Sequence, residues 1–265
     1  MPTVQLRDIV TYYEEHGSGD PLVLIMGLGG DLQAWARQIP ALSKHFRVIT
    51  FDNRGAGRTS APDKPYSIAG MAEDTAGLMD HLGIERAHVL GLSMGGMIAQ
   101  ELALSEPGRV DRLILVSTAA SIEGYVRRFV EAWMNVRRSN MSREQILRLT
   151  AVFLYSDELL NDDERFEQAI AAGLANPYEQ RDHAFLRQAK ALLAFDATGR
   201  LKNVQSPVLV TAAAGDILIP PRNSKRLAEL LPNAQYKELP GGHAGVIEYA
   251  DDYNAAFLEF LGVKK

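Results

Sequence analysis

Short apolar runs alternate with helical patterns along most of this sequence, and this alternation constrains the fold more than any other feature. Runs that are apolar at consecutive positions are typical of strands buried on both faces of a sheet. They occupy Leu22–Met26, Arg47–Phe51, His88–Leu90, Leu113–Val116 and Val208–Thr211, and a half-polar run covers Gln235–Leu239. Helical patterns lie between them, at Ile68–His81, Met94–Leu104, Pro221–Leu231 and Val246–Leu261.

This order predicts an α/β fold. Strands that alternate with helices form a doubly wound, mostly parallel sheet. Two further short strands, at Val4–Leu6 and Ile9–Glu15, are expected to form a hairpin at the sheet edge. We therefore expect a sheet of about eight strands with helices on both faces.

The stretch from Ser121 to Phe195 breaks the alternation. It contains no strand-like run and is expected to fold as several helices in succession. Because it follows the sixth predicted core strand, we interpret it as a helical cap inserted into one domain. The core would then comprise residues 1–120 and 196–265, and the cap residues 121–195.

The strongest chemical signal is the G-x-S-x-G pattern at Gly91–Gly95, with Ser93 at its centre. The pattern directly follows a predicted strand and directly precedes a predicted helix, which is the context of a nucleophile elbow. Such a turn places the serine hydroxyl at a helix N-terminus, where the helix dipole stabilises developing negative charge. Read alone, the five residues fit a serine N-cap in a tight loop equally well.

Candidate partners of Ser93 follow it in the chain. Their order is serine, acid, histidine, which is the order that accompanies a nucleophile elbow of the G-x-S-x-G type. Asp216 comes after the strand Val208–Thr211, and His243 comes after the last predicted strand. Both therefore lie in loops at the carboxyl ends of strands, where open α/β sheets build their sites. We predict that His243 is the general base and that Asp216 orients it. Asp52 and Asp111 are weaker candidates for the acid, and Asp52 is expected to be structural beside Arg54.

Acyl transfer also needs two N–H donors for the oxygen that becomes negative. The backbone N–H of Met94, just after the nucleophile, is one candidate. The backbone N–H of Leu28, in the glycine-rich loop Gly27–Gly30, is the other. The same loop does not fit a dinucleotide-binding motif, because Leu32 stands where the third glycine belongs.

Together these stretches resemble the α/β-hydrolase superfamily over nearly the whole chain. The matching segments are Gly91–Gly96, Asp52–Arg58, Gly215–Asp216 and Gly242–His243. Within the superfamily the chain looks most like small capped members: the 3-oxoadipate enol-lactonases, the cofactor-free esterases and perhydrolases, and the carbon–carbon bond hydrolases. The resemblance implies a serine esterase or lactonase that forms an acyl-enzyme on Ser93.

Four positions depart from the family or from related subclasses. Family members usually carry His-Gly at the oxyanion loop, whereas this chain has Met26 and Gly27. Leu92 and Ala244 stand where the carbon–carbon bond hydrolases commonly have Asn and an aromatic residue. Ser93 excludes the haloalkane dehalogenases, which use an aspartate nucleophile. A cofactor-free perhydrolase or haloperoxidase, a carbon–carbon bond hydrolase and a hydrolase-like ligand receptor remain alternatives, since proteins of all these kinds keep the triad.

Four aromatic residues are candidates for an acyl pocket, although simple core packing is the favoured interpretation for any single one of them. They are Trp35, Phe129, Trp133 and Phe153. The arginine pairs Arg127-Arg128 and Arg137-Arg138 are either a carboxylate site or solvated helix faces.

Composition excludes several other function classes. The 265 residues include no cysteine and carry a net charge of −5, with no basic cluster that would indicate nucleic acid. The remaining histidines lack the spacing of metal ligands. No run approaches the ~18 apolar residues of a membrane span, and the N-terminus lacks the features of a signal peptide. We expect a cytoplasmic enzyme without cofactor or metal that acts on a small-molecule ester or lactone.

Overall fold

A computed structural model describes residues 2–263 of the chain. Its centre is an eight-stranded sheet with the order β1-β2-β4-β3-β5-β6-β7-β8. The pairs β1–β2 and β2–β4 are antiparallel, and every other pair is parallel. This architecture confirms the predicted α/β fold. The strands are β1 Thr3–Leu6, β2 Ile9–His16, β3 Asp20–Ile25, β4 Phe46–Phe51, β5 Ala87–Leu92, β6 Val110–Val116, β7 Val208–Ala213 and β8 Ala234–Leu239.

Two apolar layers cover the sheet because its inner strands are apolar at successive positions. Along β3, Val23 and Ile25 belong to one layer, and Leu22 and Leu24 belong to the other. This follows from the two-residue period of a strand, in which neighbouring side chains point to opposite faces.

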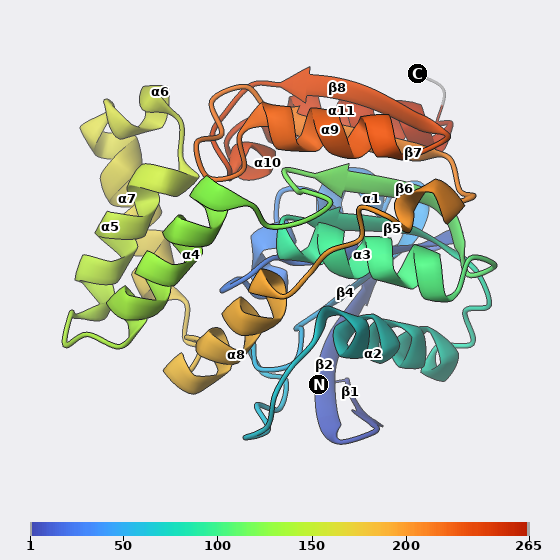
Figure 1. The fold of residues 1–265 in the computed structure, drawn as a ribbon, viewed down its shortest axis with the longest axis horizontal. Helices are drawn as coiled ribbons and strands as arrows, with labels where there is room; N and C mark the ends of the chain where they lie inside the picture. Colours follow the sequence, from blue (N-terminus) through green and yellow to red (C-terminus); the bar gives the residue numbers. More distant parts are fainter. Residues whose placement is uncertain (1, 264–265) are drawn as a thin grey trace.

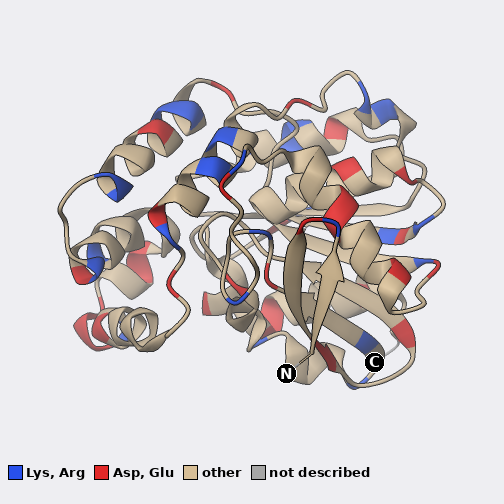
Figure 2. Ribbon diagram, turned by 90° about the horizontal axis from the view of Figure 1, so that it is seen from below, with Lys and Arg blue, Asp and Glu red and all other residues tan. Residues whose placement is uncertain are grey.

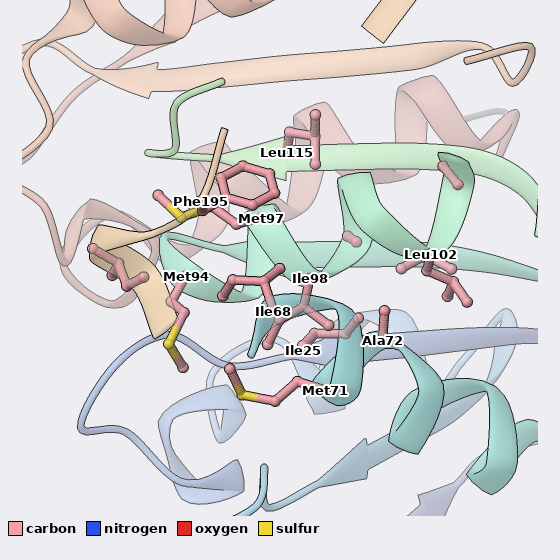
Figure 3. Packing of buried hydrophobic residues seen from close by; sticks show 14 of the residues in the cluster. Ile25, Ile68, Met71, Ala72, Met94, Met97, Ile98, Leu102, Leu115 and Phe195 are labelled. Carbon is pink, nitrogen blue, oxygen red and sulfur yellow. The ribbon is translucent and has the colours of Figure 1, made fainter. Parts of the chain in front are cut away.

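Helices complete both layers. On one face lie α2 Ile68–His81, α3 Met94–Ser105 and α9 Pro221–Leu230, with the 3-10 helix η2 Leu201–Asn203. Figure 3 shows this layer, where Met94, Met97 and Ile98 of α3 pack beside Ile68 and Met71 of α2. On the other face lie the 3-10 helix η1 Leu32–Trp35 and the helices α1 Ile39–Leu42, α10 Gly245–Glu248 and α11 Ala250–Leu261.

The C-terminal helical pattern is interrupted where the sequence predicted one helix over Val246–Leu261. Tyr249 lies between α10 and α11 with φ −119° and ψ 48°, outside the helical region. The short α10 follows the His243 loop, and because of this break its axis can point in a different direction from that of α11.

The chain between β6 and β7 contributes no strand to the eight-stranded sheet described for residues 2–263. Its helices gather at one end of the sheet, drawn in yellow-green to gold at the left of Figure 1. They are α4 Gly124–Arg137, α5 Arg143–Leu154, α6 Asp157–Leu160, α7 Asp163–Ala175 and α8 Asp182–Leu193. A bridge between Ser121 and Asp196 joins the two ends of this stretch.

Charged residues of both signs are distributed over the elements of the molecule. Figure 2 shows Lys and Arg interspersed with Asp and Glu along the helices. No helix within residues 2–263 is long and apolar enough to cross a membrane.

Candidate active site

Ser93 occupies the turn between β5 and α3 in a backbone conformation that is unusual for a serine. Its φ is 56° and its ψ is −119°, a combination that non-glycine residues rarely adopt and that costs of order 1–3 kcal/mol. The backbone around it is fixed, because Ser93 N donates to Val116 O at 2.9 Å and Thr118 Oγ1 donates to Ser93 O at 2.7 Å. The surrounding fold therefore holds the serine in the strained turn.

The two glycines of the G-x-S-x-G pattern are required by close backbone contacts. A Cβ on Gly91 would lie 2.3 Å from the carbonyl oxygen of Gly95. A Cβ on Gly95 would lie 2.0 Å from the carbonyl oxygen of Ile25, at the end of β3. Real Cβ atoms do not approach this closely, so the sharp turn depends on glycine at both positions.

His243 and Asp216 lie together at the carboxyl ends of β8 and β7. His243 Nδ1 is 2.8 Å from Asp216 Oδ2, and both side chains are buried. The other carboxylate oxygen, Oδ1, accepts hydrogen bonds from the backbone N–H groups of Leu218 at 2.9 Å and Ile219 at 2.7 Å. Because an ionised carboxylate only accepts, Nδ1 of the imidazole donates to it and Nε2 of the neutral ring is left as an acceptor.

The glycine-rich loop approaches the serine directly. A Cβ on Gly27 would lie 3.0 Å from Ser93 Cβ and 3.6 Å from Ser93 Oγ. Asn53 holds this loop by donating from Nδ2 to Met26 O at 2.7 Å. Within residues 2–263, the backbone N–H groups of Leu28 and Met94 have no acceptor in the protein. Leu28 follows Gly27 in the loop that contacts the serine, and Met94 follows Ser93 at the start of α3.

Ser93, His243 and Leu28 line a cavity of about 290 Å³. Its walls are mostly apolar side chains of α4, α5 and α8. Phe129 and Trp133 from α4 line it, and Phe185 from α8 packs against Trp133 with the ring centroids 5.0 Å apart. Ser93, His243 and the predicted aromatic pair therefore share one space.

Two of the predicted pocket residues do not line that cavity. Trp35 is fully buried in the layer beneath the opposite face of the sheet, among residues that include Leu24 and Leu42. Phe153 packs behind Phe129, with the ring centroids 4.5 Å apart, and is not among the lining residues. The prediction for Trp35 is wrong because η1 turns the chain to the other face just after the glycine-rich loop.

Polar and charged side chains also line the cavity, namely those of Arg137, Arg143, Asn176, Tyr178, Glu179 and Gln180. Of these six residues, only Arg137 was a candidate from the sequence, as part of an arginine pair. Each arginine already faces acidic or carbonyl groups. Arg137 Nε lies 2.8 Å from Asp182 Oδ1, and Arg143 Nη2 donates to the carbonyls of Gly173 and Asn176. The arginine charges are thus largely balanced within the protein.

The arginine pairs singled out from the sequence separate in the structure. Arg137 is nearly buried at the cavity, while Arg128 is exposed and pairs with Glu131 on the same helix at 3.0 Å. Arg127 donates to the carbonyl oxygen of Leu193 at 3.1 Å. Only one arginine of the two pairs therefore lies at the cavity.

The two weaker candidates for the acid lie away from His243. Asp52 accepts hydrogen bonds from the backbone N–H of Leu32 at 2.9 Å and of Arg58 at 2.8 Å, and it fixes the loop between β4 and α2. Burial raises the pKa of Asp52 above its usual value, although these two hydrogen bonds oppose the rise. Asp111 is paired with Arg86 at 2.7 Å and is partly exposed.

Tyr155 is a further titratable residue that lines the cavity. Burial raises the pKa of the Tyr155 phenol, and the nearby Glu248 carboxylate raises it further. Tyr155 therefore stays neutral at physiological pH. Across residues 2–263, no three His, Asp or Glu side chains are grouped so that they would hold a metal ion.

Comparison with known proteins gives a consistent result. A family model described as the alpha/beta hydrolase fold matches residues 20–250. The chain is 35% identical to a protein of Azorhizobium caulinodans named "Putative carbamate hydrolase RutD", over 99% of this chain and 98% of that protein. It superposes on the enol-lactonase from Burkholderia xenovorans LB400 with a TM-score of 0.89 at 30% identity, covering 98% of this chain and 99% of that one.

A third similarity is to a protein of Mycobacterium tuberculosis H37Rv named "Putative non-heme bromoperoxidase BpoC". Its TM-score is 0.87 at 31% identity, and the match covers 96% of this chain and 97% of that one. The sheet order, the strained serine between strand and helix, and these full-length similarities agree. The chain belongs to the alpha/beta hydrolase fold family.

Proposed function

We propose that this protein is a serine hydrolase that cleaves a small carboxylic ester or lactone through an acyl-enzyme on Ser93. One observation carries the proposal: the strained Ser93 opens into the same cavity as a buried histidine whose Nδ1 is 2.8 Å from a buried carboxylate. This set of groups performs nucleophilic acyl transfer on unrelated folds.

In the first half of the reaction, Ser93 Oγ attacks the carbonyl carbon of the substrate while its proton passes to His243 Nε2. Asp216 stabilises the imidazolium that forms and keeps the ring in the productive tautomer. The N–H groups of Leu28 and Met94 bind the oxygen as it becomes negative. The tetrahedral intermediate then collapses, and the leaving alcohol takes the proton from His243.

In the second half, water attacks the acyl-enzyme. His243 Nε2 accepts a proton from that water and returns it to Ser93 Oγ as the carboxylic acid departs. For a lactone, the alcohol and the acid belong to one molecule, so hydrolysis yields a single hydroxy acid. No step requires a metal ion or a cofactor.

The size and character of the cavity support a small substrate. Its volume of about 290 Å³ is at the lower end of the range for small-molecule sites. Aromatic and aliphatic side chains form most of its wall, which favours an apolar acyl group. We also propose that residues 121–195 act as a cap domain, since Phe129 and Trp133 of this stretch line the cavity above the serine.

Carbamate cleavage is a second candidate. It is favoured by the 35% identity, over almost the full length, to a protein named as a putative carbamate hydrolase. A carbamate carbonyl would accept the same attack by Ser93, with an amine or alcohol as the leaving group. The proposed site has no feature that separates the two carbonyl classes.

The test combines active-site labelling with a substrate panel. A fluorophosphonate probe should label Ser93 stoichiometrically and should fail to label the Ser93→Ala variant. Turnover should then be measured on esters, lactones and carbamates graded by acyl length and charge. Labelling that persists in Ser93→Ala would contradict the proposal, and stoichiometric labelling without sustained turnover of any substrate would indicate a ligand receptor.

A further inference from the structure

The peptide groups on both sides of His243 are anchored to groups outside the triad. The N–H of Gly242 donates to Glu248 Oε1 at 3.0 Å. The N–H of Ala244 donates to the carbonyl oxygen of Leu154, the last residue of α5, at 2.7 Å. The backbone that carries the imidazole is therefore held at two points.

Glu248 connects this loop to the segment between α5 and α6. Its second carboxylate oxygen, Oε2, accepts from Ser156 Oγ at 2.6 Å and from Ser156 N at 3.0 Å. One partly buried carboxylate thus satisfies three donors, two on the segment Leu154–Ser156 and one beside His243. Hydrogen bonds to an ionised acceptor are about twice as strong as neutral ones.

The contact between the loop and this segment is tight. A Cβ on Gly242 would lie 2.5 Å from the carbonyl carbon of Tyr155 and 2.7 Å from the carbonyl oxygen of Leu154. The two backbones touch without an intervening side chain. A shift of the segment Leu154–Ser156 therefore displaces the His243 loop directly.

From these contacts we propose that Glu248 is a positioning residue for His243. Asp216 fixes the rotation of the imidazole ring, and Glu248 fixes the peptide loop from which the ring extends. The proposal rests on the proposed function, because it concerns where Nε2 lies relative to Ser93 Oγ. Misplacement of a reacting group by about 1 Å costs up to about 10²-fold in rate.

Ser93, Asp216 and His243 all lie in the core segments 1–120 and 196–265, outside the helical stretch 121–195. The anchoring of His243 by Leu154 and Ser156 links the helical stretch to the general base itself. Substitutions in this segment should therefore lower turnover of every substrate, including the smallest esters.

The experiment compares three variants with wild type on p-nitrophenyl acetate. Glu248→Ala should lower kcat by about 10- to 10²-fold with little change in KM, because the base is displaced and the cavity is not. Glu248→Gln fills the same volume but presents an NH₂ group to N–H donors, so it should lose nearly as much kcat as Glu248→Ala. Ser156→Ala removes one donor of three and should give a smaller loss of the same kind.

Glu123→Gln is the matched control. Glu123, just before α4, accepts a hydrogen bond from Arg226 Nη1 of α9 at 2.9 Å, which is another carboxylate contact between the helical stretch and the core. It lies outside the His243 loop, and its removal should leave kcat unchanged. An equal loss of kcat in Glu123→Gln would show that any contact of this kind affects turnover, and would overturn the specific role of Glu248.

The outcomes separate this proposal from the proposed function. Wild-type kcat in Glu248→Gln, with the melting temperature unchanged, would mean that the residue only fills space. Should Glu248→Ala fail to fold, Ser156→Ala alone carries the test, and wild-type kcat in that variant would contradict the proposal. If Ser93→Ala keeps its activity, the proposed function itself fails. If Ser93→Ala is inactive while both Glu248→Gln and Ser156→Ala are normal, only the inference about Glu248 fails.

Discussion

His243 and Asp216 are joined by a buried contact of 2.8 Å between Nδ1 and Oδ2, although 27 positions separate them in the chain. The aspartate is held in turn by two backbone N–H groups from its own loop, those of Leu218 and Ile219. Its carboxylate is therefore held independently of the histidine, and it favours the tautomer in which Nδ1 carries the proton.

The first prediction concerns this contact. Asp216→Asn should leave the fold intact but stabilise the wrong imidazole tautomer, with a loss of about 10⁴-fold in kcat by analogy with serine proteases. Steady-state kinetics on an activated ester would measure the loss. Asp111→Asn is the matched control, because Asp111 Oδ2 also faces a histidine nitrogen, 3.3 Å away on His88, outside the cavity. Near-normal activity of Asp216→Asn would assign the orienting role to a different acid.

A second prediction is that the triad acts as a unit. Ser93→Ala and His243→Ala should each lower kcat by about 10⁴- to 10⁶-fold, and the double variant should lose little more than either alone, because removing either group ends the same proton transfer. Single-turnover kinetics of the three variants would measure this. Fully additive losses would show that the two residues do not share one proton-transfer step.

The third prediction tests the turn that carries Ser93. Gly95→Ala should lower the free energy of unfolding by about 1–3 kcal/mol or more, because the new Cβ would press on the carbonyl oxygen of Ile25. Gly77→Ala, inside α2, is the control. Its Cβ would meet only a side-chain atom of Leu6 at 3.7 Å, so the substitution should raise the free energy of unfolding by about 0.4–1 kcal/mol. Urea unfolding of both variants decides whether the close approach constrains the elbow.

The pH dependence of stability provides a fourth prediction. Burial lowers the pKa of His88 below the usual histidine value of about 6.5, although the nearby Asp111 carboxylate opposes this. The unfolded chain therefore binds a proton at this site before the folded protein does. The contribution of His88 to the free energy of unfolding is therefore fully present above its pKa in the unfolded chain. It is lost as the pH falls from about 6.5 toward the lower pKa of His88 in the folded protein. The free energy of unfolding should accordingly decrease over this interval.

His88→Gln should weaken that decrease, by at most about 1.4 kcal/mol per pH unit, which is the value for one proton. Urea unfolding at a series of pH values between 7 and the onset of acid denaturation would measure the slope. His45→Gln is the control, since His45 is exposed to water. An identical acid slope in wild type and His88→Gln would assign the loss to other groups.

The fifth prediction concerns the wall of the cavity. Trp133→Ala should raise kcat/KM for long acyl esters relative to acetate esters, because removing the indole enlarges the space beside Ser93. A contact change of one methylene is worth about 1–3 kcal/mol of discrimination. Tyr125→Ala is the control, as Tyr125 lies on the same helix but is 48% exposed. Unchanged acyl-chain preference in Trp133→Ala would place the acyl site elsewhere in the cavity.

Local patterns in the sequence were enough to predict the order of strands and helices. An inner strand of a parallel sheet is apolar at successive positions whatever it packs against, and a helix repeats its apolar residues on one side. The nucleophile elbow at Ser93 could also be predicted, because its pattern is local in the sequence. Its glycines are required by contacts within a turn of five residues and with the strand beside it, and the chain order of Ser93, Asp216 and His243 is a property of the sequence itself.

Tertiary structure decided the groups that complete the site, because these come from elements far apart in the chain. Trp35 follows the glycine-rich loop closely in sequence, yet η1 carries it to the opposite face of the sheet. Arg137 and Glu179, which both line the cavity, come within 3.8 Å of each other only when α4 and the segment before α8 pack together. Glu248 belongs to no motif that could be recognised in the sequence. It reaches Ser156, 92 positions away, because the break at Tyr249 lets the short α10 turn toward the helical stretch. Tertiary packing brings the hydrogen-bond donors to the Glu248 carboxylate, and no residue spacing in the sequence predicts that contact.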